Sequence, residues 1–167
     1  MLRIIGKVIV DDRQRWLVIK LLIIYLLIAV PFKTLDVIPS FANIRPNSAF
    51  IPVYAFTFGP AGAWANALGN LLFDIFTDSL TKGSLGGLIA NFCEPLLMCG
   101  LWELFVGGRF QLTTKADCVW YTIIAVLCSV FKASLIMHVV VYFYPEVNGL
   151  DFFRVVLYTE FAFYLIP

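Results

Sequence analysis

Apolar runs alternate with short breaks rich in polar residues, glycine or proline along the chain, and the runs are long enough for helices. The pattern predicts helices at about 16–36, 47–58, 60–79, 84–106, 117–143 and 151–166. Gly59-Pro60 separates the second from the third because proline pre-sets a turn and opens the helix that follows. We expect a single transmembrane domain over residues 1–167, which begins with a polar segment at 1–15.

Composition turns this helical pattern into a membrane prediction. Hydrophobic residues make up 61% of the chain and charged residues only 14%, whereas a soluble domain needs more polar surface to cover its core. A transmembrane helix takes roughly 20 apolar residues, so about six fit into the chain with short loops. The sequence therefore predicts an all-α integral membrane protein, a six-transmembrane-helix bundle embedded in the lipid bilayer.

Basic residues predict the orientation of this bundle. The amino-terminal segment carries Arg3, Lys7, Arg13 and Arg15. Positive charge favours the cytoplasmic side, and six spans return the carboxyl end to that side. We therefore expect a multi-pass protein of the plasma membrane with both termini in the cytoplasm. The loops that contain Arg45 and Lys82 are expected outside the cell.

Two polar stripes interrupt the apolar helices. Asn66, Asn70 and Asp74 follow one another at four-residue spacing in the third predicted helix, and residues four apart lie near one another on a helix. Asn91 and Glu94 share a face of the fourth predicted helix. Because a short loop joins these two helices, we expect the stripes to face each other in the outer half of the membrane and to line one pocket.

The carboxylates in these stripes need an explanation, because an unpaired charge in lipid is costly. Asp74 and Glu94 are therefore expected to be protonated, paired or bound to a ligand. Lys132 in the fifth predicted helix lies at comparable depth and is a candidate partner for Glu94, whereas His138 projects from a different side of that helix. For the asparagines, a buried polar network that only joins helices is the alternative to a pocket.

Small residues also recur on the third predicted helix. Ala61, Ala65 and Gly69 are spaced four residues apart. Such spacing in a lipid-embedded helix allows the backbones of neighbouring helices to approach closely. We expect this helix to be tightly packed.

The motifs of several enzyme classes are absent from the sequence. It contains no Walker loop, no HExxH and no GxSxG motif. His138 is the only histidine, and the four cysteines have no CxxC spacing. Basic residues do not form a patch with interleaved aromatics, which argues against a nucleic-acid partner. We expect a protein that is not an enzyme and that needs no metal or cofactor.

Three motifs in the central part of the chain resemble those of a known family. Arg45-Pro46 opens the second predicted helix, Phe58-Gly59-Pro60-Ala61-Gly62-Ala63 forms a turn, and Gly69-Asn70-Leu71-Leu72-Phe73-Asp74 lies in the third helix. Over about residues 40–105 they resemble the substrate-binding S component of energy-coupling factor (ECF) transporters. The resemblance implies a six-helix membrane subunit that binds a small, vitamin-like solute from outside the cell. It also implies docking on a transmembrane coupling subunit driven by two ATPase subunits.

The resemblance and the polar stripes together predict a solute-binding site. Its candidate residues are Arg45, Asn70, Asp74, Asn91, Glu94, Lys132 and His138. One feature departs from the family: S components commonly carry an Ala-xxx-Ala pair on the first helix, and residues 16–32 contain only Ala29. A second family is similar in architecture and in the stretch from Gly69 to Asp74, namely the small integral membrane subunit of the bacterial rod-shape complex. That alternative makes the chain a scaffold that binds protein.

Overall fold

The computed structural model describes residues 8, 11–32, 36–38, 42–43 and 46–164, with side chains described at 8, 11–32, 48–161 and 164. The α-helices are α2 (Asp12–Ala29), α3 (Ile51–Val53), α4 (Pro60–Phe76), α5 (Ser84–Phe105), α6 (Lys115–Phe143) and α7 (Gly149–Tyr164). The label η marks two 3₁₀ helices, η1 (Val30–Phe32) and η2 (Pro46–Phe50), and one π-helix, η3 (Tyr54–Phe58). The strands are β1 (Asp36–Ile38) and β2 (Ala42–Asn43). The prediction of a helical chain is confirmed. The small antiparallel pair β1–β2 was not predicted.

The structure corrects the ends of two predicted helices. The first begins at Asp12, where Asp11 caps it through a bond from the Arg13 amide to Oδ1, and its α-helical part ends at Ala29 rather than at residue 36. Pro31 follows immediately and lacks the amide that would continue the helical hydrogen bonds. The third ends at Phe76 rather than at residue 79, because Asp78 takes a left-handed conformation (φ 53°).

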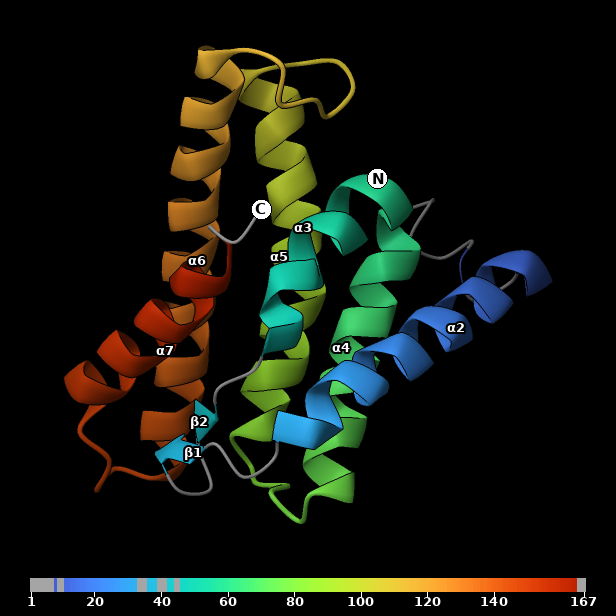
Figure 1. Cartoon of the computed structure of the whole chain (residues 1–167). Coiled ribbons are helices and arrows are strands. Elements are labelled where there is room, and N and C mark those ends of the chain that lie inside the picture. The colour runs from blue at the N-terminus through green and yellow to red at the C-terminus, as the bar shows by residue number, and fades with distance from the viewer. Residues whose placement is uncertain (1–7, 9–10, 33–35, 39–41, 44–45, 165–167) are drawn as a thin grey trace.

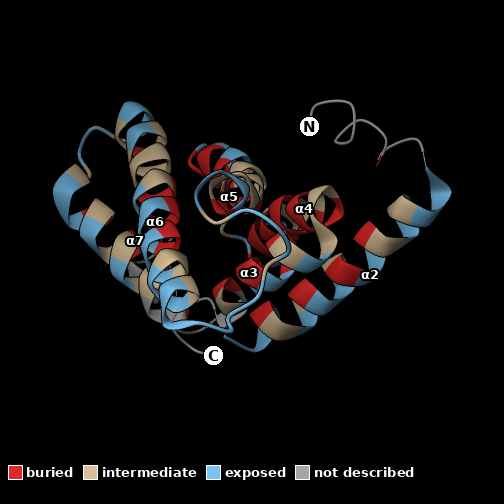
Figure 2. Ribbon diagram, turned by 90° about the horizontal axis from the view of Figure 1, so that it is seen from above, coloured by how far each residue is buried: buried red, intermediate tan, exposed pale blue. Residues whose placement is uncertain are grey.

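The long helices form a curved row in the order of the sequence. Seen from above, α2, α4, α5, α6 and α7 follow one another around an arc, and the segment at α3 lies on its concave side (Figure 2). The central helices α4, α5 and α6 run side by side, whereas α2 and α7 cross them at an angle at the two ends of the row (Figure 1). Each long helix packs on the next, so α5 lies between α4 and α6.

Close packing of α4 depends on glycine. A Cβ atom added at Gly62 would lie 2.2 Å from the carbonyl oxygen of Tyr54, and one added at Gly69 would lie 2.6 Å from Cγ of Tyr25. The Tyr54 hydroxyl in turn donates a hydrogen bond of 3.1 Å to the carbonyl oxygen of Leu21. The backbone of α4 therefore contacts the Tyr25 side chain of α2 at Gly69 and the backbone of η3 at Gly62, and this close packing is what the spacing of small residues predicts.

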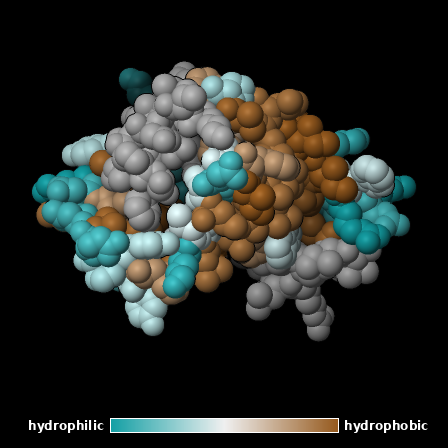
Figure 3. Space-filling view, turned by 90° about the horizontal axis from the view of Figure 1, so that it is seen from below, coloured by the Kyte–Doolittle hydropathy of each residue, from teal (hydrophilic) through white to brown (hydrophobic). Residues whose placement is uncertain are grey.

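In the described part of the chain, three helices are long and apolar enough to cross a membrane: Asp12–Phe32, Ser84–Phe105 and Lys115–Phe143. Large apolar side chains are exposed along them, for example Ile19, Ile23 and Leu27 on one face of α2. An extended apolar area also lies on the surface seen from below (Figure 3). Soluble proteins rarely expose apolar patches of this kind, so these features support a membrane protein. The helices α4 and α7, with 17 and 16 residues, are shorter than the roughly 20 residues of a typical span.

Candidate functional site

A proline in the middle of α5 organises the contact between α5 and α4. Pro95 has no amide hydrogen, so the carbonyl oxygen of Asn91, four residues earlier, loses its helical partner. The side chain of Asn66 on α4 replaces it, because its Nδ2 donates a hydrogen bond of 2.9 Å to the Asn91 carbonyl oxygen. Both asparagines are buried. The polar stripe of α4 therefore satisfies a backbone group that the sequence of α5 leaves open.

The other amides of the stripes extend this contact. The Asn91 side chain donates a hydrogen bond of 2.7 Å from Nδ2 to the carbonyl oxygen of Gly87. Asn70 lies against the same glycine, since a Cβ atom added at Gly87 would be 3.0 Å from the Asn70 Nδ2. We call Asn66, Asn70, Gly87 and Asn91 the amide network. Asp74, one turn after Asn70, is also buried.

The link between Pro95 and Asn66 gives a testable prediction. Asn66→Ala removes the donor to a buried carbonyl and is expected to lower the free energy of unfolding by about 1–2 kcal/mol. In a Pro95→Ala background the new amide of residue 95 bonds the Asn91 carbonyl itself, so the same change is expected to cost clearly less. A double-mutant cycle on unfolding in detergent measures the difference. Equal costs in both backgrounds would contradict the link.

The second polar group is charged and joins α5, α6 and α7. The Lys132 Nζ lies 3.1 Å from Oε2 of Glu94 and 2.8 Å from Oε2 of Glu160. The Tyr164 hydroxyl donates a hydrogen bond to Oε1 of Glu94. We call these four residues the charged cluster. Their exposed fractions are 0% for Glu94, 3% for Lys132, 8% for Glu160 and 2% for Tyr164.

The charged cluster lies deep in the layer of helices. Glu94 is the eleventh of the 22 residues of α5, so about 15 Å of helix separate it from either end at 1.5 Å per residue. A hydrocarbon core of about 30 Å would place it near the centre of the bilayer. At such a depth, breaking a charge pair leaves a charge without water or partner, which is strongly unfavourable. The contacts of the charged cluster therefore hold α6 and α7 against α5.

The predicted site residues fall into separate places. Asn70 and Asn91 belong to the amide network, and Glu94 and Lys132 belong to the charged cluster, where the pairing expected between them is present. His138 is exposed, and its Nδ1 lies 2.6 Å from the carbonyl oxygen of Ser134 on its own helix. Arg45 lies outside the described residues. Among the six described candidates, exposed His138 therefore does not join the buried residues at one centre.

Two residues of the charged cluster were missed by the sequence reasoning. Glu160 and Tyr164 lie four residues apart on α7, so they share one face of that helix. A signal for Glu160 was available, because it is a carboxylate within an apolar predicted helix, as Asp74 and Glu94 are. Tyr164 had no such signal, since tyrosine is common in membrane helices. The role of Pro95 as the reason for the bond from Asn66 was also missed.

The structure adds little to metal or thiol chemistry. Within the described residues, no group of three or more histidine, cysteine, aspartate or glutamate side chains has the geometry to hold a metal ion. All four cysteines, which belong to the described residues, are free thiols. Two of them have a role in helix packing. Cys128 is fully buried, and Cys99 donates a hydrogen bond of 2.9 Å to the carbonyl oxygen of Ala55.

Comparisons with protein-family models, with curated proteins and with solved structures found no match for the chain. The two polar groups and the motifs in the sequence are therefore the features that bear on function. Of the two groups, the amide network is electrically neutral, whereas the charged cluster places two carboxylates on one lysine.

Proposed function

We propose that the chain is the membrane-embedded substrate-binding subunit of an uptake transporter of the ECF type. In this proposal it spans the plasma membrane six times, with both termini in the cytoplasm. It binds a small, vitamin-like solute from the outer side and delivers it by docking on a transmembrane coupling subunit. Energy comes from two ATPase subunits of that complex, because the chain carries no Walker motif of its own.

One observation above all supports a solute site: an acceptor atom in the amide network is unused. The Asn66 Oδ1 is buried and accepts no hydrogen bond from the described residues. A buried polar atom without a partner is costly, and a solute with a hydroxyl or amine hydrogen can supply the missing donor. Asn70, Gly87 and Asn91 lie in the halves of α4 and α5 nearest the turn at 77–83, which is the outer side in the predicted orientation, and Asn66 lies one turn deeper, near the middle of α4.

Charge also narrows the class of solute. The buried carboxylates of Asp74 and Glu94 would on their own favour a solute that is a cation or an amine. Glu94, however, is already paired with Lys132 and bonded by Tyr164, so it does not call for a positively charged solute. The amide network offers neutral donors and acceptors, and it suits a neutral polar molecule better.

The proposal is tested by adding solute to the purified protein. Mass spectrometry of material that co-purifies in mild detergent identifies candidates, and each candidate is then added during thermal unfolding. A bound solute at about 100 times its Kd should stabilise the protein by about 2.7 kcal/mol, and the protein should pull down a coupling subunit. Co-purification with cell-wall synthesis proteins, together with no response to any solute, would favour the scaffold of the rod-shape complex instead.

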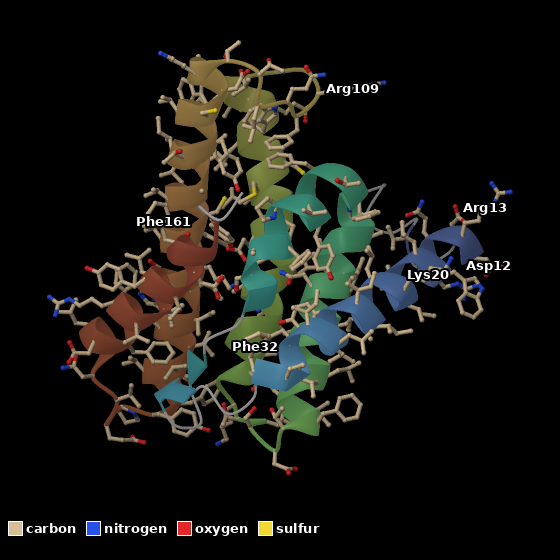
Figure 4. All side chains as sticks on the ribbon, in the orientation of Figure 1. Asp12, Arg13, Lys20, Phe32, Arg109 and Phe161 are labelled. Atoms are coloured by element: carbon tan, nitrogen blue, oxygen red, sulfur yellow. The ribbon has the colours of Figure 1, made fainter. Side chains whose placement is uncertain are left out.

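The orientation is tested by labelling in intact cells. Single cysteines are introduced by Arg45→Cys, Lys82→Cys and, as a control at the opposite end of α5, Arg109→Cys in a chain whose native cysteines are replaced. The Arg109 position lies in the connection between α5 and α6 (Figure 4). A membrane-impermeant reagent should label positions 45 and 82 but not 109. The reverse pattern would place both termini outside.

A further inference from the structure

The charged cluster contains more negative than positive groups. Glu94 and Glu160 both contact Lys132, and each does so through Oε2. No other basic side chain of the described residues lies in ion-pair range of either carboxylate. With all three groups ionised, the cluster would carry one uncompensated negative charge.

Burial makes that excess charge expensive. Glu94 has no exposed surface, and Lys132 and Glu160 have almost none. A buried charge without a partner is avoided in proteins either by pairing or by a change of protonation. Lys132 neutralises one of the two carboxylates, so the second needs another positive charge.

The described groups around the cluster do not supply this charge. From α7, Tyr164 gives its hydroxyl hydrogen to Oε1 of Glu94. From α6, the thiol of Cys128 lies close enough to Glu94 to interact with it electrostatically, and the hydroxyl of Ser129 donates to the carbonyl oxygen of Ala125. From α5, the thiol of Cys99 donates to the carbonyl oxygen of Ala55. All of these groups are neutral when protonated.

Two oxygen atoms of the cluster are also incompletely bonded. Oε2 of Glu94 and Oε2 of Glu160 are buried, and within the described residues each has no polar partner other than the Lys132 nitrogen, at 3.1 and 2.8 Å. Buried carboxylate oxygens normally accept hydrogen bonds. Either atom becomes a donor when it is protonated, so these two atoms are where a missing positive charge fits.

We propose that the Glu94–Lys132–Glu160 cluster is a proton-binding site that holds one proton, shared between the two carboxylates, at neutral pH. The proton comes from a hydronium ion of the solvent: one O–H bond of that ion breaks to leave water, and one O–H bond forms at one Oε2 atom. It belongs to the pair rather than to one residue, because both carboxylates contact the same Lys132 nitrogen. The site is independent of the solute and of the transporter family.

Infrared spectroscopy of the purified full-length protein at neutral pH tests the proposal without added solute. A protonated carboxylic acid gives a carbonyl-stretch band that a carboxylate lacks. The wild type should show one such band, and it should shift when the protein contains glutamate with a heavy carbon isotope in its side-chain carboxyl. The only glutamates outside the cluster, Glu103 and Glu146, are exposed, and a carboxyl group in contact with water is ordinarily a carboxylate at neutral pH.

Variants then assign the band to the cluster. Either Glu94→Gln or Glu160→Gln should abolish the whole band, because Lys132 neutralises the single carboxylate that remains. Lys132→Met should double its area, because both carboxylates then need a proton. Glu103→Gln on the same helix as Glu94 is the matched control and should leave the band unchanged.

Three results would overturn the proposal. They are the absence of a glutamic acid band in the wild type, a band that survives both glutamine variants, and a band that only halves in each of them. If the glutamine variants do not fold, the isotope-labelled wild type still decides, because a band that does not shift with labelled glutamate excludes the cluster.

Discussion

Replacing Glu94 and Glu160 together by glutamine is expected to lower the free energy of unfolding by about 3–5 kcal/mol, the usual cost of leaving one buried charge without its partner. The reason is that Lys132 contacts both carboxylates and, in the described part of the chain, pairs with no other group. Each single change leaves one carboxylate on Lys132, so each alone is expected to cost far less than half of the double change. Unfolding of the purified protein in detergent measures all three variants.

Two further variants make the first prediction specific. Adding Lys132→Met to the double variant removes the buried charge and should restore most of the lost stability. Glu103→Gln combined with Glu146→Gln makes the same chemical change at exposed positions, and it should stay within about 0.5 kcal/mol of the wild type. Additive losses from the two single variants would show that Lys132 is not shared.

Gly62→Ala is the second change with a large expected effect. Its Cβ would lie 2.2 Å from the carbonyl oxygen of Tyr54, and a backbone atom cannot move aside as a flexible side chain can. The segment η3 must therefore shift away from α4 and take with it the bond from Tyr54 to Leu21. We expect a loss of about 1–3 kcal/mol, as for other overpacked interiors, measured as a shift of the unfolding transition in detergent.

Gly100→Ala on α5 is the matched control for this prediction. It places the same methyl group in a helix at a position where nothing lies within 4 Å. Alanine is the better helix former, so this variant is expected to gain about 0.5–1 kcal/mol. A Gly62→Ala protein as stable as the wild type would mean that α4 and η3 are not in backbone contact.

Much of the helical layout was predictable because periodic apolar runs and proline-glycine breaks act locally. Gly59-Pro60 separates η3 from α4 where the sequence predicts it, with Gly59 in a conformation (φ 51°) that favours glycine. Helix ends were less predictable. The stop at Phe76 depends on the left-handed backbone of Asp78, a conformation that a non-glycine residue rarely takes. The pair β1–β2 has too few residues to show a pattern.

The site was predictable only in part, because the decisive contacts join distant parts of the sequence. The cost of a charge in lipid singled out Glu94, and the depth of Lys132 suggested their pairing. The same rule applied to Glu160 would have revealed a second carboxylate, but no spacing rule brings α7 against the middle of α5. The role of Pro95 depends on which α4 side chain faces it, and only the three-dimensional arrangement shows that this is Asn66.

The charged cluster also has a consequence for biosynthesis. Ribosomes deliver chains from the amino end, so Glu94 reaches the membrane before Lys132, and Lys132 before Glu160. A lone carboxylate is unfavourable in lipid, whereas α5 and α6 together carry a neutral pair. We therefore expect α5 to wait at the translocon until α6 arrives and to enter the bilayer with it as a hairpin. The helix α7, whose length falls short of a typical span, then finds a basic partner already in place.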